Sequence, residues 1–200
     1  MINPMNLEGK RILVTGASSG IGRATAIQCS KLGADIVLVG RNIDELNRTL
    51  SMLDKGEHLI LPYDFSNIDN IEQLFKKCIE NGKKLNGLVH SAGLNAIIPI
   101  GSINYKKMLE VMQVNYFSFM ELTRLFSKRK YSVNGSIVAI SSVSSVAGTK
   151  CTSLYCGSKG ALDSSIRSLS LELAQKKIRI NSVLPSYIKS NMFDAVADLA

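Results

Sequence analysis

The sequence contains no tryptophan and only two histidines, His58 and His90. Its four cysteines form no Cys-x-x-Cys pair and have no histidine cluster near them, so the sequence predicts no metal site. Residues 1–10 show no basic stretch followed by an apolar one, and no apolar run is long enough to cross a bilayer. We therefore expect a cytoplasmic protein without a membrane segment.

The chain also lacks a basic stripe, although its formal net charge is +8. The 24 lysines and arginines are spread singly and in pairs, with one run of three at 128–130, whereas a nucleic-acid-binding protein more often gathers them with interleaved aromatic residues. The sequence therefore predicts no nucleic-acid partner. One basic cluster remains a candidate for contact with an acidic partner protein, and it consists of Lys128, Arg129, Lys130, Lys176 and Lys177.

Short apolar runs alternate with longer amphipathic runs along the whole chain, which is typical of βαβ units. The short runs are apolar almost without interruption, which indicates strands of a parallel sheet buried on both faces. The expected strands are residues 11–16, 35–40, 58–64, 87–93, 136–142 and 178–185, and the expected helices are 20–32, 43–54, 67–80, 104–129 and 152–176. We expect one α/β domain over residues 1–200, with a doubly wound, Rossmann-type parallel sheet between two layers of helices.

Three of the expected helices begin with capping residues. Asn42 and Asn104 each precede a helix, where a side-chain oxygen can accept from a free backbone N–H group. Ser66 is followed three residues later by Asp69, which resembles a capping box and predicts a helix start at that point.

The stretch TGASSGIG at 15–22 joins the first expected strand to the first expected helix. It places Gly16, Gly20 and Gly22 where a backbone must approach a diphosphate at a helix N-terminus. The second strand ends in Gly40, at the place where an NAD-binding protein commonly has a carboxylate, and Arg41 follows. A missing acid together with a guanidinium group favours NADP(H) over NAD(H).

Tyr155 and Lys159 are four residues apart, so they lie on one face of the last expected helix. Because a nearby cation favours the phenolate, we expect Lys159 to lower the pKa of Tyr155. Ser142 ends the fifth expected strand and is placed to donate a hydrogen bond to the same substrate oxygen. Gly157 and Gly160 each weaken the helix by about 1 kcal/mol, which we attribute to close approach of a cofactor or a neighbouring helix.

Together these features resemble the classical short-chain dehydrogenase/reductase family, and they are similar to its 3-oxoacyl-[acyl-carrier-protein] reductases. The resemblance runs from about residue 8 to about residue 192, and the matching features are TGxxxGxG at 15–22, Asp64 after the third strand, the turn at 90–93, Asn115, Ser142 and Tyr155-x-x-x-Lys159. It implies an NAD(P)-dependent oxidoreductase that acts on a carbonyl/alcohol pair. The catalytic set that it implies is Asn115, Ser142, Tyr155 and Lys159.

The resemblance also implies a role for each of these groups. Tyr155 would give a proton to the carbonyl oxygen as hydride reaches the carbonyl carbon, and Ser142 would polarise that oxygen. Lys159 would bind the nicotinamide ribose, Asn115 would hold a water leading to solvent, and Asp64 would accept from the adenine amino group. The implied cofactor-binding residues are Gly16, Ser18, Ser19, Gly20, Ile21, Gly22, Arg41, Asp64, Phe65, Ala92, Gly93, Tyr155, Lys159, Pro185 and Ile188.

Three features depart from the family pattern. His90 and Ser91 stand where the family usually has asparagines, and we interpret His90 as structural. Ser186 replaces a usual glycine, which weakens the expected contact to the nicotinamide carboxamide. The sequence ends in an unfinished amphipathic pattern, so we expect the family's substrate lid and last strand to be missing.

The substrate is the least determined part of the prediction. The expected wall is mostly apolar, which favours an apolar carbonyl compound such as a 3-oxoacyl group on an acidic acyl carrier protein, and it comprises Ile97, Ile98, Ile100, Val143, Val146, Tyr187 and Met192. Three functions stay open: an NADPH-dependent carbonyl reductase, which the full set of reacting groups favours, an NAD-linked alcohol or sugar dehydrogenase, and a nucleotide-binding scaffold without turnover. The family further implies a homodimer or homotetramer through the helices at 104–129 and 152–176.

Overall fold

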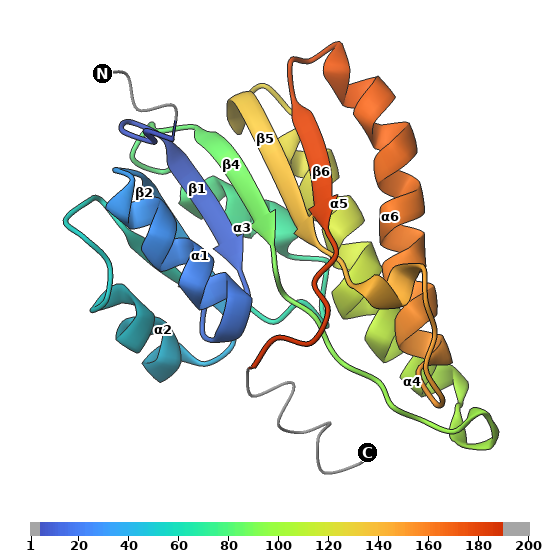
Figure 1. Cartoon of the computed structure of the whole chain (residues 1–200). Helices are drawn as coiled ribbons and strands as arrows, with labels where there is room; N and C mark the ends of the chain where they lie inside the picture. The colour runs from blue at the N-terminus through green and yellow to red at the C-terminus, as the bar shows by residue number, and fades with distance from the viewer. Residues whose placement is uncertain (1–4, 190–200) are drawn as a thin grey trace.

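The computed structural model describes residues 5–189, which form a six-stranded parallel sheet with helices on both faces (Figure 1). The strands are β1 (Arg11–Thr15), β2 (Asp35–Gly40), β3 (Leu59–Pro62), β4 (Leu85–His90), β5 (Ser132–Ile140) and β6 (Arg179–Val183). Their spatial order is β3-β2-β1-β4-β5-β6, and every neighbouring pair is parallel. The predicted Rossmann-type architecture is confirmed.

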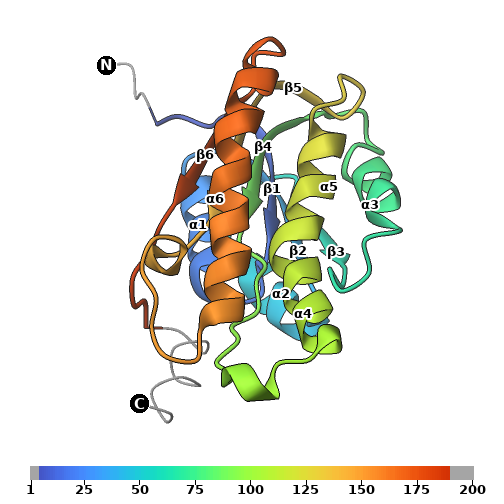
Figure 2. The same cartoon turned by 90° about the vertical axis from the view of Figure 1, so that its right-hand side faces the viewer.

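The helices form two layers, which Figure 2 shows from the side of the larger layer. That layer contains α3 (Ile71–Cys78), α5 (Ser118–Phe126) and α6 (Ser153–Ala174), and the opposite face carries α1 (Gly20–Lys31) and α2 (Ile43–Leu50). The single helix expected over 104–129 consists of α4 (Tyr105–Met112), a π-helical segment η2 (Gln113–Phe117) and α5. Two short 3₁₀ helices are η1 (Ile100–Ser102) and η3 (Val143–Ser145). None of the helices within residues 5–189 combines the length and the apolar character needed to span a membrane.

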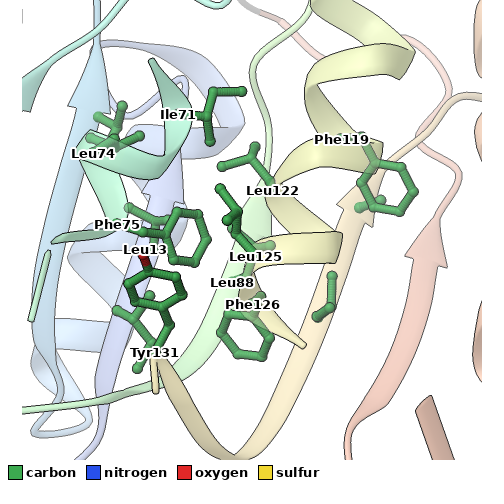
Figure 3. Close-up of a cluster of buried hydrophobic side chains, with 14 of the residues drawn as sticks. Leu13, Ile71, Leu74, Phe75, Leu88, Phe119, Leu122, Leu125, Phe126 and Tyr131 are labelled. Carbon is green, nitrogen blue, oxygen red and sulfur yellow. The ribbon is translucent and has the colours of Figure 1, made fainter. Parts of the chain in front are cut away.

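Successive residues of the central strands enter two separate cores. On the face of α3 and α5, Leu13 and Leu88 pack among apolar residues that include Phe75 and Tyr131, whose ring centroids are 5.2 Å apart (Figure 3). On the other face, Val14 packs with residues of α1 and α2. Burial of both faces explains why the strands read as continuous apolar runs in the sequence.

Two of the three expected helix caps are present. The side chains of Asn42 and Asn104 accept from the backbone N–H three residues further on, at 3.1 and 3.0 Å. The capping box at Ser66 is wrong, because α3 begins only at Ile71. Instead, the Asp64 carboxylate accepts from the Ser66 backbone N–H at 2.9 Å and fixes a turn there, a local contact that competes with helix formation.

Strand order reverses between β1 and β4, since β2 and β3 continue on one side of this pair and β5 and β6 on the other. All the strands point the same way, so the segments that follow them meet at the carboxyl edge of the sheet. In doubly wound sheets this reversal point is where ligands bind.

Candidate active site

A cavity of about 720 Å³ lies at the carboxyl edge of the sheet and is lined by segments that follow all six strands. The cavity brings together nearly every residue of the site predicted from the sequence. The lining residues from that prediction are Gly16, Ser18, Ser19, Gly20, Ile21, Arg41, Asp64, Phe65, Ala92, Gly93, Ser142, Tyr155, Lys159, Pro185 and Ile188. Gly22 and Asn115 were also predicted but do not line the cavity. Gly22 packs against Gly16, and Asn115 bonds to Leu94, so both contact residues that do line it.

The turn after β1 requires glycine at two positions. Gly16 has a φ of +65°, and a Cβ there would lie 2.8 Å from the Ser91 carbonyl oxygen. A Cβ on Gly22 would overlap the Gly16 carbonyl oxygen, so Gly22 allows α1 to pack closely against the turn. The first residues of α1 therefore face the cavity, where their free N–H groups and the helix dipole favour an anion such as a diphosphate.

The end of β2 presents one cation to the cavity. Arg41 is exposed and lines the cavity next to buried Gly40, where a Cβ would lie 3.3 Å from the Ser18 hydroxyl oxygen. Arg23, by contrast, is held by the Glu45 carboxylate and donates to the Thr49 hydroxyl at 2.9 Å. Arg41 is thus the guanidinium group placed to meet a phosphate at this end of the cavity.

Thr15 ties the end of β1 to the turn after β4. Its hydroxyl oxygen accepts from the backbone N–H groups of Ser91 and Ala92, both at 3.0 Å, and lies 3.3 Å from His90 Nδ1. His90 is completely buried, and burial, assisted by the charge of Lys159, lowers its pKa to about 3. His90 is therefore neutral at pH 7 and belongs to the support of the turn rather than to the cavity wall.

Tyr155 and Lys159 lie one turn apart at the start of α6, and both line the cavity. The Lys159 ammonium is 5.8 Å from the centre of the Tyr155 ring and donates to the Ile140 carbonyl oxygen at 2.7 Å. Because Lys159 is only 4% exposed, burial lowers its pKa to about 8, while the charge of Asp163 acts in the opposite direction.

The pKa of Tyr155 differs from the sequence prediction. Burial raises this pKa, and a hydrogen bond with Ser142 opposes the rise. The predicted lowering by Lys159 is therefore wrong in this structure, because the ring is desolvated and the ammonium is directed to Ile140.

Ser142 is the N-cap residue of η3, two residues after β5 ends, rather than ending the strand as expected. Its hydroxyl oxygen accepts from the Ser144 backbone N–H at 3.1 Å and also takes part in the hydrogen bond with Tyr155. The hydroxyl groups of Ser142 and Tyr155 therefore converge on one point of the cavity, with the Lys159 ammonium nearby.

Asn115 lies in the π-helical segment η2 and is fully buried. Its side-chain oxygen accepts from the Leu94 N–H at 2.7 Å, and its amide nitrogen donates to Leu94 and Ser158 at 3.0 and 2.9 Å. A Cβ added to Gly93 would be 3.4 Å from the Asn115 oxygen and 3.6 Å from the Lys159 ammonium. Asn115 therefore fixes the loop after β4 beside Lys159.

Apolar atoms make up most of the exposed wall of the cavity, as predicted, although polar side chains lie among them. Ile97, Val143 and Tyr187 line it as expected, whereas Ile98, Ile100 and Val146 do not, and Met192 lies outside the described residues. Polar lining residues that sequence reasoning missed are Ser91, Asn95, Ser144, Thr149, Lys150 and Thr152. They lie in the loops after β4 and β5, where the sequence has no periodicity to show which side chains face inward.

The two glycines of α6 also differ from expectation. Among the described residues, a Cβ on Gly157 would meet nothing within 4 Å, and a Cβ on Gly160 would make only an ordinary 3.6 Å contact with the Ser145 carbonyl oxygen. Close packing within the described chain therefore does not explain either glycine.

A parallel α/β sheet with a glycine turn at its reversal point and a Ser-Tyr-Lys group in the adjoining cavity defines a Rossmann-type enzyme of the nucleotide-binding class. Residues 10–199 match the model of the short chain dehydrogenase family, and the chain belongs to this family. The family's members named below are dehydrogenases and reductases, so the chain is an oxidoreductase.

Three similar proteins illustrate the family. The chain is 36% identical to glucose 1-dehydrogenase of Gluconobacter oxydans (strain 621H), over 90% of this chain and 70% of that protein. It is 32% identical to the 3-oxoacyl-[acyl-carrier-protein] reductase FabG of Rickettsia prowazekii (strain Madrid E), over 95% of this chain and 77% of that protein. The structure of a short chain dehydrogenase from Shigella flexneri 2a str. 301, complexed with NADP, has a TM-score of 0.88 at 28% identity, covering 99% of this chain and 85% of that one.

Proposed function

We propose that the chain is an NADPH-dependent carbonyl reductase in which Tyr155 donates the proton to the carbonyl oxygen. The observation that carries the proposal is the convergence of the Ser142 and Tyr155 hydroxyl groups beside Lys159, in the same cavity as the glycine turn. The bound nucleotide would supply the hydride, and the similar Shigella flexneri protein is complexed with NADP.

The cavity residues divide into two binding regions for this nucleotide. The glycine turn with Ser19 and Gly20 would hold the diphosphate, Arg41 the 2′-phosphate, and Asp64 the adenine. At the other end, the nicotinamide half would lie against Ala92, Gly93, Pro185 and Ile188, beside Tyr155 and Lys159. The fit rests on the exposed start of α1 and on Arg41, a cation that faces the cavity.

The protonation states suit reduction at neutral pH. Because burial raises the pKa of Tyr155, its phenol carries the proton that a developing alkoxide needs. The hydrogen bond with Ser142 orients that phenol, and the Lys159 ammonium stabilises the negative charge that forms as the proton leaves. Asn115 keeps the loop after β4 in place behind Lys159.

A substrate panel followed by the absorbance of NADPH tests the proposal. We expect turnover with at least one ketone of a panel that includes a cyclic ketone, a 2-oxo ester and an acetoacetyl thioester. Tyr155→Phe should lower kcat by roughly 10²–10⁴-fold without preventing NADPH binding. Tyr105→Phe is the matched control, since Tyr105 lies on α4, is 73% exposed and does not line the cavity. Turnover by Tyr155→Phe within tenfold of the wild type would refute the assigned role.

The same assay separates the two alternatives. An NAD-linked dehydrogenase would reduce NAD with an alcohol or a sugar and would prefer NADH to NADPH in the reverse direction. A scaffold without turnover would bind NADPH, detected by the fluorescence of the nucleotide, and would oxidise none of it across the panel. Arg41 and the missing acid at Gly40 favour the NADPH reading over the first alternative.

Delivery of a 3-oxoacyl group by an acyl carrier protein receives no support from the basic cluster. Tyr155 lies at the start of α6, whereas Lys176 follows its end, about 31 Å away at roughly 1.5 Å per residue. Arg129 likewise precedes β5, whereas Ser142 follows it. A carrier docked on the cluster would sit at the opposite edge of the sheet from the reacting groups (Figure 1). Equal rates with free and carrier-bound acetoacetyl thioesters would exclude a carrier as partner.

We also keep the proposal of a homodimer or homotetramer through α4, α5 and α6. Light scattering coupled to size-exclusion chromatography measures the mass of the particle in solution. A monomer at micromolar concentration would refute it.

A further inference from the structure

Asp163 is a charged residue next to the site to which the proposed function gives no role. It lies on α6 one turn after Lys159, and its carboxylate accepts a hydrogen bond from the Ser141 hydroxyl at 2.7 Å. The second carboxylate oxygen, Oδ1, is buried, and no donor within residues 5–189 bonds to it. A buried carboxylate oxygen without a donor is unfavourable, so its position calls for a compensating interaction.

Asp163 and Lys159 bond to neighbouring residues of the Ile140–Ser142 corner, where the chain leaves β5. Lys159 donates to the Ile140 carbonyl oxygen at 2.7 Å, and the next residue, Ser141, donates to Asp163. Ser142 follows directly and meets the Tyr155 hydroxyl. Two side chains of α6 therefore hold the segment from which Ser142 reaches the substrate oxygen.

The two α6 side chains also carry opposite charges, on a buried lysine and a partly buried aspartate. Lys159 is 4% exposed, which disfavours its ammonium form, and the Asp163 charge raises its pKa against that effect. Residues at i and i+4 of a helix lie about 5–6 Å apart at their Cβ atoms, within the range of such an effect. No direct ion pair joins them in the described structure, because Lys159 donates to Ile140 and Asp163 accepts from Ser141.

The other groups near Lys159 supply no negative charge at neutral pH. His90 of β4 is neutral, with a pKa of about 3, and the Tyr155 phenol on α6 is protonated. η2 brings Tyr116, whose hydroxyl is bonded to Ser165, and η3 has no titratable residue. The remaining titratable side chains of the packed elements are Cys156, Arg167 and Glu172 on α6, Tyr105, Lys106, Lys107 and Glu110 on α4, and Arg179 at the far end of β6. All of these except Cys156 are exposed, including Arg167, which lies one turn after Asp163.

We propose that Asp163 is a positioning residue, which keeps Lys159 in its charged form and holds the Ile140–Ser142 corner in place for Tyr155. The inference rests on the proposed function, since it assumes that charged Lys159 binds the nicotinamide ribose. In this proposal the negative charge of Asp163 acts on Lys159, and the hydrogen bond that Asp163 accepts holds Ser141.

Two variants separate these parts. Asp163→Asn removes the charge and keeps an oxygen that accepts from Ser141, whereas Ser141→Ala removes the hydrogen bond and keeps the charge. The readout is the dissociation constant of NADPH as a function of pH, measured by nucleotide fluorescence on the whole chain, which has no tryptophan to interfere. Wild-type binding should weaken as the pH rises through about 8, where Lys159 loses its proton.

The expected results differ in direction. In Asp163→Asn the pH midpoint, at which NADPH binding is half lost, should fall by about one pH unit. This shift weakens NADPH binding at pH 8 roughly fivefold. In Ser141→Ala the midpoint should not fall, while kcat for the ketone identified by the panel decreases. Asp163→Glu should restore the wild-type midpoint, which a merely structural role would not predict.

An unchanged midpoint in Asp163→Asn would overturn the inference and leave the proposed function intact. If Asp163→Asn does not fold, as judged by circular dichroism, Asp163→Ser removes the same charge and is measured in the same way. A wild-type chain that binds no NADPH at any pH would overturn the proposed function, and this inference with it.

Discussion

Replacing Lys159 by methionine should stabilise the protein while it destroys activity. Burial lowers the pKa of Lys159 from its ordinary 10.5 to about 8, and each pKa unit corresponds to about 1.36 kcal/mol. Keeping this ammonium buried and charged at pH 7 therefore costs about 3 kcal/mol. Methionine has a similar length and no charge, but it leaves the Ile140 carbonyl oxygen without its donor, which costs about 1–2 kcal/mol. The net expectation is a free energy of unfolding about 1–2 kcal/mol higher.

The pH dependence gives this prediction a second test. Below about pH 8 Lys159 is charged in both the folded and the unfolded chain, so the full penalty is present. Between about 8 and 10.5 the unfolded chain binds more protons than the folded one, and wild-type stability rises relative to the variant. The advantage of Lys159→Met should therefore be largest at pH 7, vanish between about pH 9 and pH 10, and reverse at higher pH, where only the lost hydrogen bond to Ile140 remains.

Urea unfolding followed by far-ultraviolet circular dichroism is the appropriate assay, because the chain has no tryptophan. Lys106→Met is the matched control, since Lys106 is an exposed residue of α4, and its stability should stay within about 0.5 kcal/mol of the wild type. The reasoning is refuted if Lys159→Met is less stable than the wild type at pH 7. It is also refuted if the difference stays constant between pH 7 and pH 10.

Three further substitutions test separate parts of the structure. Gly22→Ala places a Cβ on the Gly16 carbonyl oxygen and should lower the midpoint of thermal unfolding and abolish NADPH binding. Gly157→Ala meets no neighbouring atom among the described residues and should stabilise α6 by up to about 1 kcal/mol. Equal thermal midpoints for the two variants would contradict this. The neutral form of His90 stabilises the fold above pH 6.5, and this contribution is lost as the pH falls toward 3, so His90→Asn should flatten an acid titration followed by circular dichroism; an equally steep titration would argue against it. Arg41→Ala should weaken NADPH binding about tenfold in fluorescence titrations and leave NADH unchanged; an equal loss for both nucleotides would show that Arg41 does not meet the 2′-phosphate.

The strands and the ligand-facing edge could be predicted from the sequence because two physical signals coincide there. Burial on both faces makes each parallel strand a continuous apolar run, so the glycine turn after Thr15 and the segment around Ser142 were recognisable as strand ends. Carboxyl ends of parallel strands share one edge, which places distant residues such as Arg41, Asp64 and Gly93 in one cavity.

Features that depend on tertiary contacts were not predictable in the same way. The π-helical segment that carries Asn115 has the same apolar spacing as the helices on either side, so the sequence indicates only one long helix. The pKa values of Tyr155 and Lys159 depend on their burial and on the direction of the Lys159 ammonium toward Ile140. Asp163 is an ordinary acidic residue in the sequence, and only the fold places it against Ser141.

The first half of α6 contains both contacts that fix this helix to its neighbours and residues that are proposed to act in catalysis. From Leu162 onward the helix buries apolar residues in the core, but its start contains Gly157 and Gly160, which weaken a helix by about 1 kcal/mol each. The hydrogen bonds of Asn115 with Ser158 and of Lys159 with Ile140 fix this start against η2 and β5. Lys159→Met removes one of these contacts together with an unfavourable charge, so the sign of its effect on the free energy of unfolding shows which of the two is larger.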